Sequence, residues 1–199
     1  MSEPMSGSPG PLLIQPVRHH DARGWFSETF SAARLAAAGV TCGFPQDNQS
    51  WSAAAGTVRG LHFQRPPSAQ AKLVACLQGR ISDCIVDLRA GSPTYGHCLQ
   101  VELGDTGEQL FVPVGFAHGF VTLTPETIVS YKVSHPYDPA AEGGLAWNDP
   151  MLKLDWPLPP SGAVVSEKDA ALGLLSSIES PFAYTGGPMT LTRVEGQDS

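Results

Sequence analysis

A short segment, Gly56–Gln64, concentrates polar side chains that could carry out acid–base chemistry. It holds Arg59, His62 and Gln64 within six residues of a sequence that otherwise has the character of a β-strand. Residues two apart on a strand point to the same face, which predicts that His62 and Gln64 share a face. Lys72 begins the next apolar segment. A lysine is unusual there unless its ammonium group has a binding partner or a functional role.

The segment Pro113–Phe120 contains a Pro-x-Gly-x-x-His pattern that ends in His118 and resembles the second metal-binding motif of cupins. The first cupin motif would supply two histidines and a glutamate, whereas these positions hold His62, Gln64 and approximately Gln70. Catalytic zinc usually takes three protein ligands, and iron oxygenases take two histidines plus a carboxylate. Two histidines and two glutamines make a poor metal site, so we predict no metal and a hydrogen-bonded, pocket-lining role for His118.

Other polar groups have roles that the local sequence leaves open. Tyr131 lies in a strand-like segment, where a tyrosine more often packs than reacts. Asp169 follows Ser166 by three residues, so it either supports a helix N-terminus or orients an imidazole. Arg23 and Arg59 are scarce cations in this chain, and guanidinium groups suit the oxygens of a diphosphate.

A further group could recognise a nucleotide base. The polar side chains of Glu28, Gln46 and Asn48 offer hydrogen-bond partners for a base edge, and Phe26 could stack on its ring. Taken alone, these residues fit an ordinary surface strand and loop equally well.

The elements that must position these groups are mostly strands. Turn signals divide the middle of the chain at intervals of roughly 8 to 13 residues, which is typical of an all-β sandwich or barrel. The predicted strands are Lys72–Leu77, Arg80–Leu88, His97–Leu103, Gln109–Val112, Phe116–Leu123 and Thr127–Ser134. Two helices are predicted at Ser31–Ala38 and Ser166–Leu175, each opened by a capping serine. We therefore predict an all-β fold, a cupin-type double-sheet jelly roll with small peripheral helices.

Composition limits the class of protein. The 199 residues are 42 % hydrophobic and 16 % charged, which excludes an extended disordered chain. The net charge is −7, whereas nucleic-acid binders usually carry a surplus of basic residues. We therefore predict no nucleic-acid partner. No apolar run approaches the roughly 20 residues of a membrane span, and the N-terminus does not resemble a signal peptide. We predict a cytoplasmic protein that does not bind membranes, with the four cysteines reduced.

Taken in order along the chain, these motifs resemble the dTDP-4-dehydrorhamnose 3,5-epimerase family. The motifs are Asp21-x-Arg-Gly-x-Phe-x-Glu28, Gln46-Asp-Asn48, Arg59-Gly-Leu-His-Phe-Gln64, Gln70-Ala-Lys72, Val86-Asp-Leu-Arg89, Ser92-Pro-Thr-Tyr-Gly96, Pro113-x-Gly-Phe-Ala-His-Gly-Phe120, Tyr131-Lys132, Glu142, Trp147-Asn-Asp-Pro150 and Ser166-Glu-Lys-Asp169. The resemblance covers about Val17 to Leu175, with departures only at positions that do not react. It implies a homodimer, no metal or other cofactor, and a role in making dTDP-L-rhamnose for surface polysaccharide.

The resemblance also implies roles at the reacting centre. The substrate would be a 4-keto-6-deoxyhexose on a dTDP carrier, whose C3 and C5 protons are acidified by the neighbouring C4 carbonyl. His62 would be the base, oriented by Asp169, and Tyr131 would donate a proton from the opposite face. Lys72 would stabilise the enolate oxygen.

The remaining implied contacts surround the sugar and the nucleotide. His118 would assist near the sugar, and the phosphates would be held by Arg23, Arg59 and Lys168. Glu28, Gln46 and Asn48 would contact the nucleotide, and Glu142 its base. Tyr137 is a further substrate-binding candidate and the next candidate for the proton donor. Arg23, Phe26 and Glu28 are expected to act across the dimer, because the N-terminal strand would pack on the partner.

Three other functions stay open at this point. The first is an epimerase of a related sugar that acts on only one carbon, C3 or C5. The second is a metal-dependent cupin oxygenase, and the third is a sugar-nucleotide binding protein without catalysis. We expect the epimerase domain to span residues 11–181, with a flexible tail at 1–10 and a C-terminal tail at 182–199 whose order the sequence does not reveal.

Overall fold

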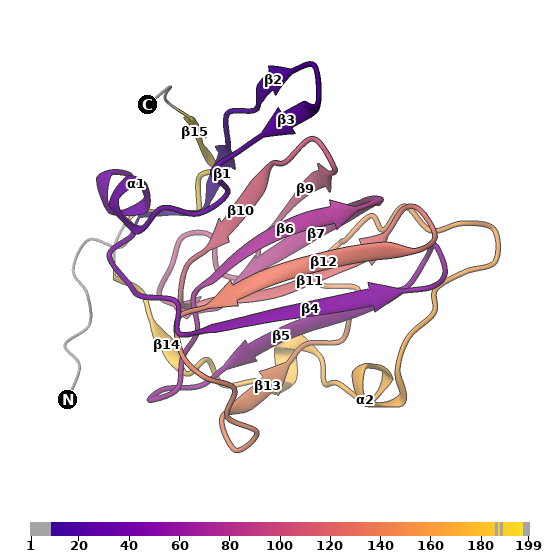
Figure 1. Cartoon of the computed structure of the whole chain (residues 1–199). Coiled ribbons are helices and arrows are strands. Elements are labelled where there is room, and N and C mark those ends of the chain that lie inside the picture. The colour runs from indigo at the N-terminus through magenta and orange to yellow at the C-terminus, as the bar shows by residue number, and fades with distance from the viewer. Residues whose placement is uncertain (1–8, 186, 188, 197–199) are drawn as a thin grey trace.

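Two β-sheets packed face to face form the body of the protein in the computed structural model, which describes residues 9–185, 187 and 189–196 (Figure 1). The six-stranded sheet consists, in spatial order, of β15 (Thr192–Glu195), β1 (Leu12–Gln15), β10 (Gln109–Val112), β6 (Lys72–Gln78), β12 (Thr127–Val133) and β4 (Gln46–Ser52). The five-stranded sheet consists of β13 (Glu142–Gly144), β5 (Val58–Gln64), β11 (Phe116–Thr122), β7 (Arg80–Asp87) and β9 (Cys98–Gly104). This arrangement confirms the predicted all-β double-sheet jelly roll.

The smaller elements lie at the periphery. They are the hairpin of β2 (His19–Asp21) and β3 (Gly24–Phe26), the parallel pair of β8 (Arg89–Ala90) and β14 (Phe182–Ala183), the helices α1 (Ala32–Ala37) and α2 (Glu167–Ala170), and the 3-10 turn at Leu175–Ser177. All six predicted strands occur, with ends that differ by at most one residue. None of the helices in the described part of the chain is long and apolar enough to cross a membrane.

Apolar side chains separate into three buried clusters. The cluster between the sheets includes Val74, Ile85 and Leu110, all fully buried. A second cluster lies on the outer face of the five-stranded sheet, where the chain between Leu145 and Phe182 covers β5 and β7, and a third lies under α1. Burying one such side chain stabilises the fold by about 1.5–3 kcal/mol.

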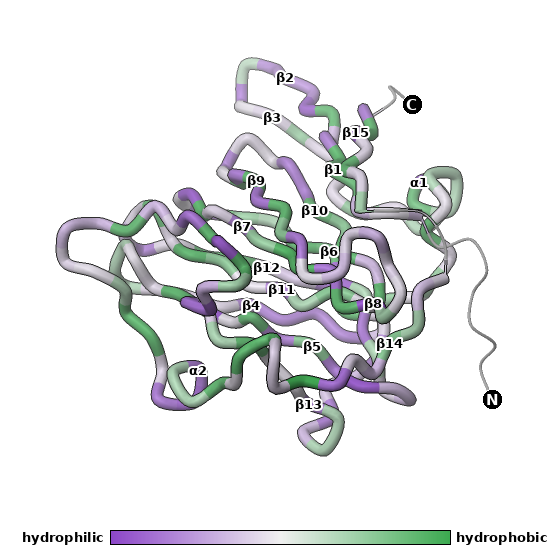
Figure 2. Tube along the Cα trace, turned by 180° about the vertical axis from the view of Figure 1, so that it is seen from behind, coloured by the Kyte–Doolittle hydropathy of each residue, from purple (hydrophilic) through white to green (hydrophobic). Residues whose placement is uncertain are grey.

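The interior becomes polar toward β4. Its half-buried or buried side chains alternate along the strand with exposed ones, and they are Gln46, Asn48, Ser50 and Ser52. Figure 2 shows β4 as a hydrophilic strand. Polar groups on the inner face of a sheet cannot complete an apolar core, so this end of the sandwich is the region able to hold a polar ligand.

The two predicted helices have different outcomes. The first, α1, starts after its capping residue Ser31, as predicted. The second was predicted to reach Leu175, but α2 ends at Ala170, and this part of the prediction was wrong. The backbone beyond α2 is used elsewhere, because the carbonyl of Gly173 accepts a hydrogen bond from the N–H of Ala146 and the N–H of Leu175 donates to Asp149. Gly173 also lowers the helix propensity there.

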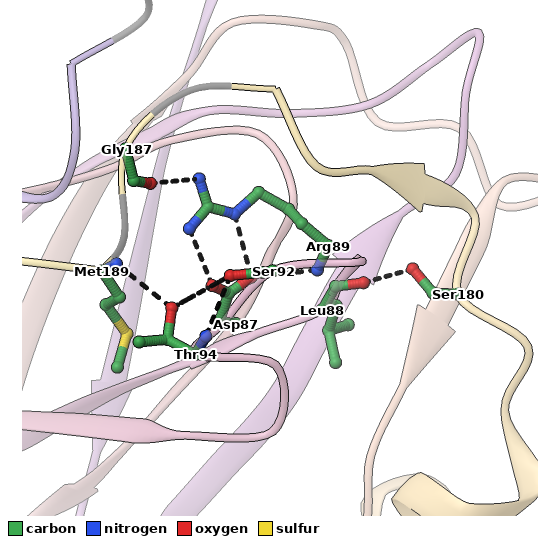
Figure 3. Close-up of polar contacts among 8 residues, drawn as sticks. All are labelled: Asp87, Leu88, Arg89, Ser92, Thr94, Ser180, Gly187 and Met189. Carbon is green, nitrogen blue, oxygen red and sulfur yellow. Dashed lines mark hydrogen bonds and ion pairs between the residues drawn. The ribbon is translucent and has the colours of Figure 1, made fainter.

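The C-terminal segment, whose order the sequence did not reveal, supplies β14 and β15. It is anchored to Arg89, which forms a buried ion pair with Asp87; Nη2 of Arg89 lies 2.7 Å from Oδ2 of Asp87 (Figure 3). Arg89 also donates to the carbonyl of Gly187, and Thr94 accepts a hydrogen bond from the N–H of Met189. Residues 1–8 of the predicted N-terminal tail lie outside the described residues, and the domain boundaries stay a prediction.

Candidate active site

His62 and Asp169 form a hydrogen-bonded pair on the inner side of β5. Nε2 of His62 lies 2.7 Å from Oδ1 of Asp169, while Oδ2 of Asp169 accepts the N–H of Gly60 at 3.0 Å. An ionised carboxylate can only accept, so Nε2 carries the proton and Nδ1 of the neutral imidazole is left with a lone pair. Burial opposes the ionisation of Asp169, but the hydrogen bonds from His62 and Gly60 outweigh it and lower the pKa of this carboxyl.

Asp169 reaches β5 because α2 begins directly after its capping residue Ser166. The hydroxyl of Ser166 accepts the N–H of Asp169 at 3.1 Å, which is the expected geometry of an N-cap. Asp169 therefore combines the two roles that its sequence position left open, since it supports the helix start and also contacts an imidazole.

A β-bulge in β5 sets the direction of Arg59. His62 is paired with His118 on β11, but Arg59 is paired with Phe120, so three steps on β5 match two steps on β11. The extra residue turns Arg59 to the same side as His62, although strict alternation would put the two on opposite faces. The guanidinium group of Arg59 donates to the hydroxyl of Ser52, on the inner face of β4, at 3.2 Å.

Lys72 connects the two sheets at this point. Its side chain starts on β6, and Nζ donates to the backbone carbonyl of His62 at 3.2 Å. Burial lowers the pKa of Lys72 to about 8, against the attraction of the carboxylates of Asp83 and Glu142. A lysine with this pKa is cationic at neutral pH and gives up its proton more readily than an exposed lysine.

Tyr131 lies beside Lys72 on the inner face of the six-stranded sheet. Lys72 is paired with Val133 of β12, so Tyr131, two residues away on β12, is its diagonal neighbour on the same face. Burial raises the pKa of the Tyr131 phenol, and the nearby charge of Arg59 only partly offsets this effect. The phenol therefore keeps its proton at neutral pH and can act as a proton donor.

His118 is buried next to His62, and its partner is a residue that the sequence interpretation missed. Nε2 of His118 lies 3.0 and 2.9 Å from the two carboxylate oxygens of Asp83, which is fully buried on β7. The expectation of a hydrogen-bonded imidazole at position 118 is thus confirmed. An aspartate in a strand that also holds Ile81, Ile85 and Val86 was the sequence signal for this pair.

A chain of hydrogen bonds runs along the open side of the site. Tyr137 donates from its hydroxyl to Glu142 at 2.9 Å, and Lys168 donates to the same carboxylate at 2.6 Å. Burial opposes ionisation of Glu142, but these two donors lower the pKa of its carboxyl. The N–H of Tyr137 donates to Gln46 at 3.0 Å, and the amide of Gln46 donates to Asn48 at 2.8 Å.

Gln64 holds the loop that carries Tyr137. Its buried amide nitrogen donates to the carbonyls of Ser68, at 2.7 Å, and Pro136, at 3.3 Å. Its amide oxygen accepts the N–H of Asp138 at 2.9 Å. All three contacts are inside the protein, so Gln64 acts on the site by positioning the loop, a role that the sequence interpretation did not foresee.

Three predicted substrate-binding residues are not brought to this site within one chain. The side chain of Arg23 is 90 % exposed and pairs with Asp21, Phe26 is 71 % exposed, and Glu28 pairs with Arg34 at 3.2 Å. The hairpin of β2 and β3 lies at the end of the molecule opposite β13 and α2 (Figures 1 and 2). Their roles stay predictions that require a second chain.

The described residues contain no group of three or more His, Cys, Asp or Glu side chains that could hold a metal ion. His62 and His118, the two histidines in the metal hypothesis, each contact one carboxylate, and these carboxylates belong to different residues. The four cysteines are free thiols.

Comparison with known proteins assigns this chain to a family. The family model described as dTDP-4-dehydrorhamnose 3,5-epimerase matches residues 7–177. The chain belongs to the dTDP-4-dehydrorhamnose 3,5-epimerase family. A family member from Sinorhizobium fredii is 47 % identical over 173 residues, which are 86 % of this chain and 88 % of the relative.

Solved structures agree with this membership in the 3,5-epimerase family. A dTDP-6-deoxy-D-glucose-3,5-epimerase from Legionella pneumophila, in complex with dTDP-4-keto-L-rhamnose, has a TM-score of 0.83 and 40 % identity, covering 87 % of this chain and 93 % of that one. A 3′-monoepimerase from Streptomyces bikiniensis, in complex with dTDP-quinovose, has a TM-score of 0.78 and 31 % identity, covering 84 % and 85 %. The 3,5-epimerase fold therefore also occurs in an enzyme described as acting at one carbon.

Proposed function

We propose that this protein inverts C3 and C5 of dTDP-4-dehydro-6-deoxy-D-glucose, which gives dTDP-4-dehydro-L-rhamnose, the precursor of dTDP-L-rhamnose. The observation that carries the proposal is the hydrogen-bonded pair of His62 and Asp169 beside the buried ammonium group of Lys72. A sugar-nucleotide binding protein has no need of a half-buried base next to a buried cation. The reaction class is an isomerisation through an enolate.

His62 is the base in this mechanism. The C4 carbonyl acidifies the protons at C3 and C5, and Nδ1 of His62 removes one of them. The imidazolium that forms is stabilised by the ionised Asp169, 2.7 Å from Nε2, so the proton transfer does not leave an isolated charge in the site. Positioned acid–base catalysis of this kind contributes about 10²- to 10⁴-fold in rate.

Lys72 stabilises the negative charge that develops at O4. Its ammonium group comes from β6, in the sheet facing His62, and burial strengthens its interaction with a developing oxyanion. Losing one such donor typically costs about 2.7–4 kcal/mol of transition-state stabilisation.

Tyr131 returns a proton from the opposite side of the ring. It belongs to β12 in the six-stranded sheet, while His62 belongs to β5 in the five-stranded sheet, so a sugar bound between the sheets has one group on each side. Reprotonation on the side opposite to deprotonation inverts the carbon. The raised pKa of Tyr131 keeps the phenol protonated between turnovers.

The nucleotide part of the substrate is assigned to the polar end of the sandwich. We propose that Arg59 and Lys168 contact the phosphates and that Gln46, Asn48, Tyr137 and Glu142 contact the nucleoside. His118 lies beside His62 and contacts the sugar. Hydrogen bonds connect five of these side chains, which supports a single elongated site; the five are Gln46, Asn48, Tyr137, Glu142 and Lys168.

The site is proposed to be completed by a second copy of the chain. Arg23, Phe26 and Glu28 would come from the partner's N-terminal hairpin, which supplies a cation for the diphosphate and a ring for stacking. The strong exposure of Arg23 and Phe26 in the single chain supports this part of the proposal.

The deciding experiment is NMR of the products formed from dTDP-4-dehydro-6-deoxy-D-glucose in deuterium oxide. We expect deuterium at both C3 and C5 and inversion at both carbons. Inversion at only one carbon would instead assign a monoepimerase, the alternative favoured by the likeness to the Streptomyces enzyme. No deuterium at either carbon, with folded protein, would overturn the proposal.

The base has its own control in the same assay. His62→Ala is expected to fold and to abolish deuterium incorporation, whereas His135→Ala should exchange at the wild-type rate. His135 is a suitable control because its ring makes a hydrogen bond to the backbone carbonyl of Pro136 and has no role in the proposed mechanism. Exchange at the wild-type rate in the His62 variant would remove this residue from the role of base.

A further inference from the structure

A second pair of a histidine and an aspartate lies beside the proposed catalytic pair. His118 on β11 is directly opposite His62 on β5 in the antiparallel register. Side chains at such paired positions lie side by side on one face of the sheet. In each ring Nε2 contacts a carboxylate, that of Asp83 at 2.9 Å for His118 and that of Asp169 at 2.7 Å for His62. The site therefore contains two neighbouring imidazole rings, each held by its own carboxylate.

Asp83 lies in an otherwise apolar part of the interior. It is on β7 between Ile81 and Ile85, which belong to the cluster between the sheets, and its exposed fraction is 0 %. Both of its carboxylate oxygens lie within 3.0 Å of Nε2 of His118. A buried pair of this kind is seldom better for stability than apolar side chains of similar volume. The presence of an aspartate here therefore indicates a functional demand on His118.

The contact with Asp83 leaves one ring nitrogen of His118 free. An ionised carboxylate can only accept, so Nε2 carries the proton and Nδ1 of the neutral ring has a lone pair. Nδ1 forms no hydrogen bond to the described residues. It is also not among the fully buried polar atoms without a partner, which in the described chain are the hydroxyls of Ser27 and Ser50. Nδ1 is therefore the atom of this ring that a ligand in the site can reach.

We propose that Asp83 is a positioning residue of the epimerisation, which holds the His118 ring in one tautomer so that Nδ1 accepts a hydrogen bond from a hydroxyl group of the sugar. This inference rests on the proposed function, whose substrate keeps hydroxyl groups at C2 and C3. An acceptor for one of these hydroxyls, next to His62, orients the sugar ring while His62 removes a proton from carbon. Orientation of this kind lowers the barrier because the reacting atoms are already in place.

Asp83 also acts on Lys72 through its charge. Burial lowers the pKa of Lys72 to about 8, against the attraction of Asp83 and then of Glu142. The other ionisable side chains on the elements around Lys72 are those of Arg59, His62, His118, Tyr131 and Asp169. An anion stabilises the ammonium form, so removing the charge of Asp83 should lower the pKa of Lys72 further. A purely structural aspartate would not produce this effect.

The kinetic test uses Asp83→Asn, which keeps the shape of the side chain but can donate as well as accept. The variant no longer enforces one tautomer of His118, so we expect kcat/KM at pH 7 to fall about 10- to 100-fold. Its alkaline decrease in kcat/KM should begin at a lower pH than in the wild type. The control is Glu102→Gln, which removes one negative charge from an exposed residue of β9 that pairs with Arg80 at 3.0 Å. The control should match the wild type in both respects.

A spectroscopic measurement on the protein without substrate tests the tautomer independently of activity. Nitrogen-15 NMR of labelled histidine shows which ring nitrogens carry a proton, and the His118 signals are assigned by their loss in His118→Gln. At pH 7 the wild type should have a protonated Nε2 and an unprotonated Nδ1. Asp83→Asn should show a different distribution of the proton between the two nitrogens.

The outcomes separate this inference from the proposed function. A protonated Nδ1 in an active wild type would overturn the inference alone, and so would Asp83→Asn with the wild-type tautomer and kcat/KM. If Asp83→Asn does not fold, the wild-type spectrum decides. The expected spectrum in a protein that epimerises neither carbon would overturn the proposed function and, with it, the role of Asp83 in the reaction.

Discussion

The ammonium nitrogen of Lys72 lies 3.2 Å from the backbone carbonyl oxygen of His62, and this contact joins the six-stranded sheet to the five-stranded sheet. The proposed cation and the proposed base are thereby held at a fixed separation by two strands of different sheets. Groups on strands are positioned more accurately than groups on loops, which suits an enzyme that must stabilise an enolate while it moves a proton.

The charge of Lys72 predicts a pH dependence of activity. Burial lowers the pKa of Lys72 to about 8, so its ammonium form is lost as the pH rises through that value. We expect kcat/KM to fall above pH 8 in the wild type. Lys72→Met should be slower by about 10²- to 10³-fold at neutral pH and should lack this alkaline decrease. An alkaline decrease of the same size in the Lys72 variant would show that another group causes it.

The same group predicts an opposite trend for stability. Below pH 8 both the folded and the unfolded chain hold the Lys72 proton, and burial of the charge costs stability. Between pH 8 and the usual pKa of 10.5, the folded chain loses this proton first, so the free energy of unfolding contributed by Lys72 rises, by up to about 3 kcal/mol. Urea unfolding of wild type and Lys72→Met at pH 7 and 10 measures the difference, and a gain of equal size in both would contradict this account.

Tyr131→Phe separates deprotonation from reprotonation. Because His62 and Lys72 are unchanged, the variant should still exchange a C3 or C5 proton with deuterium oxide. It should not form inverted product, because the phenol that returns the proton from the other side is missing. Mass spectrometry of the recovered substrate and NMR of the product give the two readouts. Normal turnover with inversion would transfer the donor role to Tyr137.

Gln64→Leu tests the positioning of the Tyr137 loop. The substitution keeps a similar volume but leaves the carbonyl of Ser68 and the N–H of Asp138 without their partner. Each buried unpaired group costs about 1–3 kcal/mol, so we expect the loop to loosen and KM to rise about 10-fold or more, with a smaller change in kcat.

A matched control for Gln64 is Gln78→Leu. Gln78 also donates to one backbone carbonyl, that of Glu126, at 2.8 Å, but it lies at the other end of β6 from Lys72. Its KM should stay within twofold of the wild type. A kcat loss with unchanged KM in the Gln64 variant would point to a role at the reacting centre instead.

The proposed contribution of a second chain predicts complementation between two defective variants. His62→Ala removes the base, and Arg23→Ala removes a cation that we assign to the partner's site. In a mixed dimer one site would carry both defects and the other would carry none. Random pairing should therefore restore about a quarter of the wild-type activity. If Arg23 served its own chain, every site would keep one defect and mixing would restore nothing.

The sequence by itself determined the class of fold and the family. Short apolar segments between turn signals indicate strands regardless of where those strands lie in the fold. The six strands predicted this way all occur. The order of the motifs was enough to indicate an epimerase, because each motif is a local pattern. The N-cap at Ser166 and the cap at Ser31 were predictable for the same reason, since a cap depends on residues within one turn.

Only the tertiary structure decided which side chains meet. Arg59 and His62 share a face because a bulge adds one residue to β5, and that residue is recognisable only from the pairing with β11. Asp83 became the partner of His118 through the register of β7 with β11, and α2 stopped early because the backbone that follows it bonds to Ala146 and Asp149. Pairing, register and hydrogen bonding between distant segments depend on the whole folded chain, whereas a sequence pattern reports only local preference.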